Sequence, residues 1–193
     1  MRPGKVTAYL GEKLAEKYPV GEKVCAFYDH GKPDDPAVGA IRPYLRGFPF
    51  DNQSVLADID IMIVEDKRAV ILIEIEETAA NPKQIMGDVF APFFAESVRF
   101  KKSAEYRLEN TCLIVGLLTA PCQSAASKIK RLGEAIKKLQ SELDETDFPL
   151  SIGEIHFICR AEGSELIQDV TRLVEVLLKK NLKIAPSGSD NKI

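Results

Sequence analysis

The strongest pattern of hydrophobic and polar positions lies in the first half of the chain. There, two runs rich in Ile, Val and Leu are separated by two polar residues. The runs are Ser54–Glu65 and Arg68–Glu77, and the break between them is Asp66-Lys67. Short β-branched runs on either side of such a break are typical of a β-hairpin. We therefore predict two antiparallel strands at this point.

Apolar residues at helical spacing predict further helices around this hairpin. They cover Thr7–Tyr18, a segment from Asn81-Pro82 to Phe100, Ser124–Leu143 and the segment capped by Ser164. Asn81-Pro82 offers a favoured N-cap residue followed by a favoured first residue. Pro92 is expected to kink or split that helix before Phe93–Phe100.

Short apolar runs predict strands at Lys23–Tyr28, Thr111–Thr119 and Ser151–Cys159, whereas the Gly-, Pro- and Asp-rich stretch Asp29–Asp51 predicts a long loop. Strands and helices alternate in the second half of the chain. This order favours an α/β fold in which a mixed central β-sheet is flanked by helices. We expect a single domain over residues 1–183 and a disordered tail over residues 184–193.

Four acidic residues interrupt the apolar hairpin. Asp58 and Asp60 lie in its first run, and Glu74 and Glu76 lie in its second. Residues i and i+2 point to one face of a strand, so each pair shares a face. A two-residue loop would put the two pairs on opposite faces, whereas a three-residue loop or one bulge would bring them together. We infer the odd-numbered loop, because the alternative buries charges beside a row of isoleucines.

Carboxylates gathered on one face repel one another unless a cation binds them. Their hard oxygen atoms suit Mg²⁺ or Mn²⁺, which can activate water and stabilise charge on a phosphoryl group. The hairpin therefore indicates a metal-assisted phosphodiesterase with Asp58, Asp60, Glu74 and Glu76 as metal ligands. The alternative is that the acids form a solvated outer face of the sheet. The pattern alone leaves both interpretations open.

The order of elements and acids resembles the PD-(D/E)xK nuclease superfamily, which has the restriction-endonuclease-like fold. Its signature is an Asp on one hairpin strand followed by Glu/Asp-x-Lys on the next. Here Asp58 or Asp60 precedes Glu74-Ile75-Glu76, and the resemblance covers roughly residues 7–118. It implies a Mg²⁺- or Mn²⁺-dependent nuclease acting on DNA or RNA, with DNA favoured over RNA, and it leaves a homodimer open.

The chain departs from this signature, because no Pro precedes the Asp and Glu76 replaces the lysine. We predict that Asp58, Glu74 and Glu76 are catalytic and that Lys83, in the first turn of the next helix, supplies the missing positive charge. Gln84 matches a helical Gln of exonuclease-like branches, which implies a nucleic-acid contact. A non-catalytic nucleic-acid-binding or assembly module of the same fold is the alternative. Glu76 and the net charge of −3 favour it.

A second candidate nucleic-acid interface lies just before the hairpin. Arg42 and Arg46 alternate there with Tyr44, Phe48 and Phe50. Arginines can contact phosphates, and aromatic rings can stack on bases. We therefore predict that Arg42 and Arg46 bind nucleic acid.

Composition narrows the remaining classes of protein. Apolar residues make up 45% and charged residues 28%, which is ordinary for a globular chain. The longest apolar stretch, Thr111–Cys122, is too short to span a bilayer, so no membrane partner is expected. Four cysteines without a C-x-x-C pair indicate free thiols and a cytoplasmic protein. The two histidines form no H-E-x-x-H or His-Cys motif, so a zinc enzyme is not expected.

Overall fold

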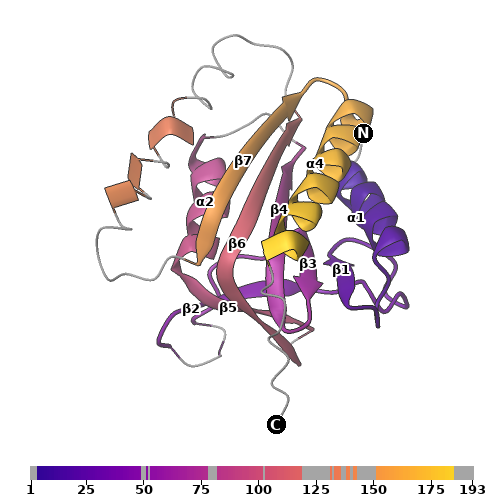
Figure 1. Ribbon diagram of the computed structural model, residues 1–193, viewed down its shortest axis with the longest axis horizontal. Coiled ribbons are helices and arrows are strands. Elements are labelled where there is room, and N and C mark those ends of the chain that lie inside the picture. Colours follow the sequence, from indigo (N-terminus) through magenta and orange to yellow (C-terminus); the bar gives the residue numbers. More distant parts are fainter. Residues whose placement is uncertain are drawn as a thin grey trace.

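A computed structural model describes residues 4–48, 51, 53–77, 82–101, 103–118, 131, 133–135, 138–139, 141–142 and 151–184. Its helices are α1 (Lys5–Lys17), α2 (Pro82–Phe94) and α4 (Gly163–Ile184). Its strands are β1 (Val24–Tyr28), β2 (Ile41–Leu45), β3 (Ile61–Glu65), β4 (Arg68–Glu76), β5 (Ala95–Phe100), β6 (Ala104–Leu118) and β7 (Ile152–Arg160). The strands form one sheet with helices on both faces (Figure 1). This arrangement confirms the predicted mixed α/β architecture.

The seven-stranded sheet runs in the order β1-β3-β4-β6-β5-β2, with β7 paired to β6. β1, β3 and β4 are antiparallel neighbours, whereas β4, β6 and β7 are parallel ones. β6 is 15 residues long because its two halves have different neighbours. Ala104–Arg107 pair with β5, and Thr111–Leu118 pair with β7.

The sheet curls because its edge strand β2 also contacts the segment that leads into β3. The backbone N–H of Leu56 donates to the carbonyl of Pro43 at 3.2 Å, and that of Ile59 donates to the carbonyl of Ile41 at 2.8 Å. Two residues after Ile59 the chain enters β3. Residues 56–59 therefore join the β2 edge to the opposite half of the sheet.

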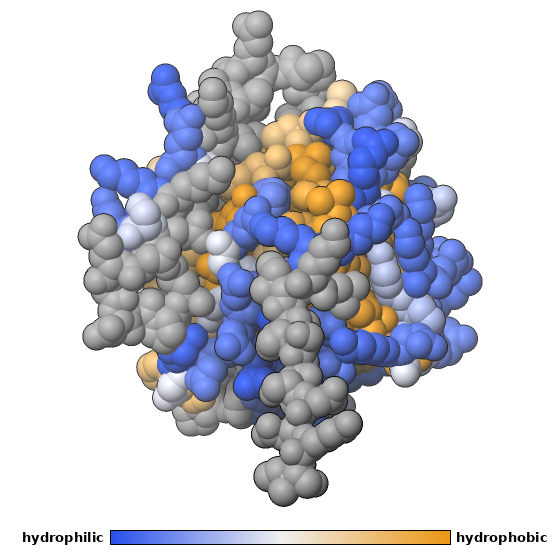
Figure 2. Space-filling view, viewed as in Figure 1, coloured by the Kyte–Doolittle hydropathy of each residue, from blue (hydrophilic) through white to orange (hydrophobic). Residues whose placement is uncertain are grey.

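Each face of the sheet carries its own hydrophobic core. On one face, Leu10 of α1 and Leu166 and Val170 of α4 pack against the strands. On the other, Val89 and Phe93 of α2 do so. α1 and α4 lie side by side, and Lys17 of α1 forms an ion pair with Glu175 of α4 (Figure 1). Apolar surface shows between α4 and β7, framed by polar side chains (Figure 2).

The β3–β4 hairpin reaches the expected register by a different route. Its loop has two residues, Asp66 and Lys67, since Glu65 pairs with Arg68. Asp66 adopts a left-handed conformation with φ 55°. The register then shifts next to Ile63, leaving Val70 of β4 as the extra residue of a bulge. The odd-numbered loop was wrong, but the bulge pairs Ile61 with Ile73 and Ile63 with Ile71, so these isoleucines share a face as expected.

The burial of the hairpin isoleucines on one face of the sheet is confirmed with one exception. Ile61, Ile63, Ile71, Ile73 and Ile75 are buried in the core beneath α1 and α4. Ile59 is fully buried in the other core, on the α2 face. Ile59 lies in a different core from the other isoleucines because the chain runs alongside β4 only from Ile61, where β3 begins.

Three segments have a different secondary structure from the one that the sequence predicts. The expected loop Asp29–Asp51 contains β2. α2 continues through Pro92 to Phe94, and the expected second half of that helix is strand β5. β6 starts at Ala104 rather than Thr111. In each case, pairing with a distant strand determines the local structure.

Two other predictions fall largely outside the described residues. The described residues between 131 and 142 are helical, but most of the helix expected at Ser124–Leu143 is not described, and neither is the tail 185–193. In the part of the chain that is described, no helix is both long and apolar enough to cross a membrane.

Candidate functional site

Two glutamates are buried on the central strand β4. Glu74 is 6% exposed and Glu76 is 8% exposed. By strand alternation they share the α2 face with Leu72, and their register partners on β6 are Val115 and Leu117. Carboxylates are seldom buried to this degree unless they are paired or bind a metal. The site is therefore built into the core face of the sheet, which rules out a solvated outer face for these two acids.

Asp60 lies where β3 and β4 separate. The last pair before the chain diverges is Ile61 with Ile73. Beyond it, the backbone N–H of Ile75 donates a 2.7 Å hydrogen bond to Oδ2 of Asp60. The Asp60 carboxylate is thus held against the backbone between Glu74 and Glu76.

Asp58 has a different environment. It belongs to the segment that contacts β2, and its Oδ1 accepts a 2.9 Å hydrogen bond from Nε of Arg42. The side chains are 55% and 30% exposed, respectively. Of the two aspartates, Asp60 is therefore the one whose carboxylate contacts β4 beside Glu74 and Glu76.

The carboxylates do not converge as closely as expected. Over the described residues, no three of the four hairpin acids place an oxygen each within 4.8 Å of one another. Glu74 and Glu76 are two residues apart on an extended strand, which separates their Cα atoms by about 7 Å, and Asp58 is bound to Arg42. Mg²⁺ can nevertheless bind through one or two carboxylates and several waters, so the donor set fits this ion. The assignment of Asp58, Asp60, Glu74 and Glu76 as metal ligands stays a prediction.

The helix that follows β4 begins as the sequence predicts. α2 starts at Pro82, which makes Lys83 and Gln84 the second and third residues of its first turn. The side chains of both lie outside the described part of the structure. Only residues 77–81 separate β4 from α2, and a chain of that length spans at most roughly 20 Å. The first turn of α2 therefore begins within roughly 20 Å of the end of β4 where Glu76 lies.

Glu77, which was not among the predicted site residues, ties α1 to the same end of β4. Its Oε1 accepts hydrogen bonds from the backbone N–H and the hydroxyl of Thr7, at 2.8 and 3.0 Å. Thr7 lies in the first turn of α1, where N–H groups have no partner within the helix. Glu77 thus caps α1 from a distant position in the sequence, directly after the end of β4.

The predicted nucleic-acid contacts at Arg42 and Arg46 are both engaged within the protein. Arg42 pairs with Asp58. Nη2 of Arg46 donates to Oγ of Ser151 at 3.1 Å, and the Arg46 backbone N–H donates to the carbonyl of Phe94. Arg46 therefore links the end of β2 to the starts of β5 and β7. Nucleic-acid binding by either arginine stays a prediction.

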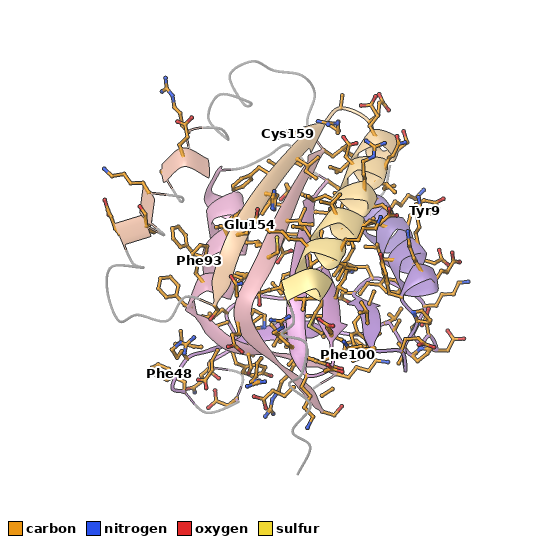
Figure 3. The ribbon with its side chains drawn as sticks, viewed as in Figure 1. Tyr9, Phe48, Phe93, Phe100, Glu154 and Cys159 are labelled. Carbon is orange, nitrogen blue, oxygen red and sulfur yellow. The ribbon has the colours of Figure 1, made fainter. Side chains whose placement is uncertain are left out.

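A cluster that the sequence did not reveal lies on the opposite face of the sheet. Cys112, Glu154 and His156 place one potential metal-ligating atom each within 4.8 Å of one another. Cys112 is buried beneath α4, and burial, followed by the charge of Glu154, raises the pKa of its thiol to about 12. Figure 3 labels Glu154 on β7. The available signal was the i, i+2 spacing of Glu154 and His156, but Cys112 is far away in sequence.

Comparison with known proteins identifies no relative. No family model matches the chain, and no curated protein and no solved structure matches it.

Proposed function

We propose that this protein is a metal-dependent nuclease that hydrolyses phosphodiester bonds at the carboxyl end of β4. The observation that carries the proposal is the pair of buried carboxylates, Glu74 and Glu76, with Asp60 held between them by the N–H of Ile75. The partial match of Asp60 and Glu74-Ile75-Glu76 to the PD-(D/E)xK signature supports it. So does the succession of α1, the β3–β4 hairpin, α2 and the parallel strand β6, with β1, β2 and β5 as additional strands.

The chemistry needs a nucleophile, a proton acceptor and positive charge near the phosphate. Water adds to phosphorus and passes its proton to a carboxylate. The bond from phosphorus to one sugar oxygen breaks, and that oxygen takes up a proton from solvent to leave as a hydroxyl. Glu76, in place of the motif lysine, can accept that proton. When bound, Mg²⁺ or Mn²⁺ supplies charge neutralisation and lowers the pKa of water. The first turn of α2 adds a helix N-terminus, which favours anions such as phosphate.

The decisive experiment compares Asp60→Asn with Asp58→Asn. Asparagine can still accept the hydrogen bond from Ile75, so Asp60→Asn removes charge while the fold is kept. We expect Asp60→Asn to lower Mg²⁺- or Mn²⁺-dependent cleavage of DNA by about 100-fold or more. Asp58→Asn should lower it much less, because the Asp58 carboxylate is engaged with Arg42. Cleavage would be followed on single- and double-stranded DNA and RNA. Equal activity of both variants would contradict the assignment of Asp60.

Lys83 is tested separately, as the source of the missing positive charge. We expect Lys83→Ala to lower turnover ten-fold or more, about 1.4 kcal/mol in the barrier, with metal affinity nearly unchanged. Lys67→Ala is the matched control, because Lys67 is exposed in the hairpin loop at the other end of β4. Unchanged turnover in Lys83→Ala would remove this lysine from the reaction.

The rival function, a non-catalytic binding or assembly module, is favoured by Glu76 in place of the motif lysine and by the net charge of −3. The same substrate panel separates the two functions. Retention of DNA in an electrophoretic assay without cleavage, with Mg²⁺ or Mn²⁺ present, would establish the module and overturn the nuclease.

A further inference from the structure

We propose that Cys112, Glu154 and His156 form a Zn²⁺ site with three protein ligands and a fourth position open to water. The three residues come from the neighbouring parallel strands β6 and β7. Cys112 pairs in register with Glu154, and Ile114 pairs with His156. Their side chains share the α4 face, where Cys112 packs in the core with Ile114.

The geometry is close to what a tetrahedral ion requires. With zinc–ligand bonds of 2.0–2.3 Å, ligand atoms on a tetrahedron lie about 3.3–3.7 Å apart. Nε2 of His156 already lies 3.1 Å from Oε1 of Glu154. The full set falls within 4.8 Å, so tetrahedral spacing requires shifts of at most about 1.5 Å.

The environment of the Nε2 atom of His156 supports a metal ion shared with Glu154. Its Nε2 atom is buried and makes no aligned hydrogen bond with any described residue, although Oε1 of Glu154 is close. A buried ring nitrogen without such a bond is costly to the protein, and an ion between Nε2 and Oε1 would satisfy both atoms.

Lys180 of α4 binds the second oxygen of the Glu154 carboxylate. Its Nζ donates to Oε2 of Glu154 at 3.2 Å, which leaves Oε1 as the oxygen facing His156. Outer contacts of this kind orient ligands in metal sites. The side chains of His156 and Glu154 are 28% and 45% exposed, so we expect water to reach the fourth position.

The donor set selects the metal. One thiolate, one imidazole and one carboxylate suit Zn²⁺ or its spectroscopic substitute Co²⁺, whereas Mg²⁺ avoids sulfur. The site is also separate from the acidic hairpin, because Glu74 and Glu76 lie on the opposite face of the sheet, beside Val115 and Leu117. This proposal therefore does not depend on nuclease activity.

The test is titration of the full-length, chelator-treated protein with Zn²⁺ and Co²⁺. We expect one Zn²⁺ per chain, unaffected by excess Mg²⁺. Bound Co²⁺ should show a thiolate-to-cobalt charge-transfer band and the visible bands of four-coordinate cobalt. Zn²⁺ should also raise the Tm of the wild-type protein. Asp60→Asn should bind Zn²⁺ like wild type, which keeps this outcome distinct from that of the hairpin.

Three variants locate the ion. Cys112→Ser should abolish the charge-transfer band, and His156→Gln should weaken Zn²⁺ binding by about 100-fold or more, since even outer-shell losses cost 10- to 100-fold. Cys159→Ser is the matched control, because Cys159 lies on β7 (Figure 3) but packs against the other hydrophobic core. His156 is part-exposed, so its variant remains informative if Cys112→Ser fails to fold. Absence of stoichiometric Zn²⁺ binding, or binding lost in Cys159→Ser but kept in His156→Gln, would overturn the site.

Discussion

At the scale of single residues, Tyr28 is the clearest example of how close packing changes chemistry. Its side chain is buried, and its hydroxyl donates to Oδ2 of Asp35 at 3.2 Å. Gly11 and Gly31 lie against the ring at positions where a Cβ would overlap it. Burial, followed by the charge of Asp35, raises the pKa of Tyr28 to about 12.

This pKa predicts how stability changes at alkaline pH. The ordinary pKa of tyrosine is 10.0, so folding favours the neutral phenol. The stabilising contribution is complete below pH 10 and is lost as the pH rises through about 12. We expect Tyr28→Phe to be less stable than wild type at pH 8, where it lacks the hydrogen bond, and this difference to shrink above pH 10. Urea unfolding across this range measures it, with Tyr9→Phe as the exposed control. A constant difference at every pH would contradict the prediction.

Residues also show where sequence inference stops. Strand alternation placed Glu74 and Glu76 together, because that rule needs only local geometry. The choice between Asp58 and Asp60 was out of reach, because it depends on where the chain leaves β2 for β3. The Cys112 cluster was out of reach as well, since the pairing of β6 with β7 joins residues with no motif between them.

At the scale of elements, the hairpin core is expected to dominate stability. Ile73 is fully buried beneath α1 and α4. We expect Ile73→Ala to lower the free energy of unfolding by roughly 2–5 kcal/mol, through lost burial and the cavity left behind. Denaturant unfolding followed by circular dichroism measures this change.

The matched control is Val176→Ala, because Val176 of α4 is 56% exposed. Substitutions at such surface positions usually change the free energy of unfolding by less than about 0.5 kcal/mol. A cost under about 1 kcal/mol for Ile73→Ala would mean that the isoleucine face contributes little to the core.

Elements with strong local patterns were predictable, and those defined by distant partners were not. The hairpin, the start of α2 at Pro82 and the last helix follow from apolar spacing and capping residues. β2 contains Pro43 and two neighbouring polar or aromatic residues, so it lacks a clean alternating pattern. It becomes a strand by pairing with β5 and residues 55–59, which no local rule anticipates.

At the scale of the whole molecule, the curled sheet has a centre that is covered on both faces and an edge that is less firmly held. β4 and β6 have strand neighbours on both sides and helices over both faces. β2 and residues 55–59 lie at the edge, and residues 55–59 are not a continuous strand. The candidate hairpin site lies at the junction of these two parts, since Asp60 follows the marginal segment and binds the central strand at Ile75.

This division predicts two classes of amide protection in native-state hydrogen exchange. Central amides such as those of Leu72 and Leu113 should exchange only through global unfolding, and their exchange free energy should equal the free energy of unfolding. The amides of Leu56 and Ile59, whose carbonyl partners are on β2, should exchange through a smaller opening at lower free energy. Ile73→Ala should lower the first value fully and the second little, because the opening at the edge leaves the isoleucine core intact. Equal protection of both sets would mean that the edge and the centre of the sheet unfold as one unit, and that Asp60 is held as firmly as β4 itself.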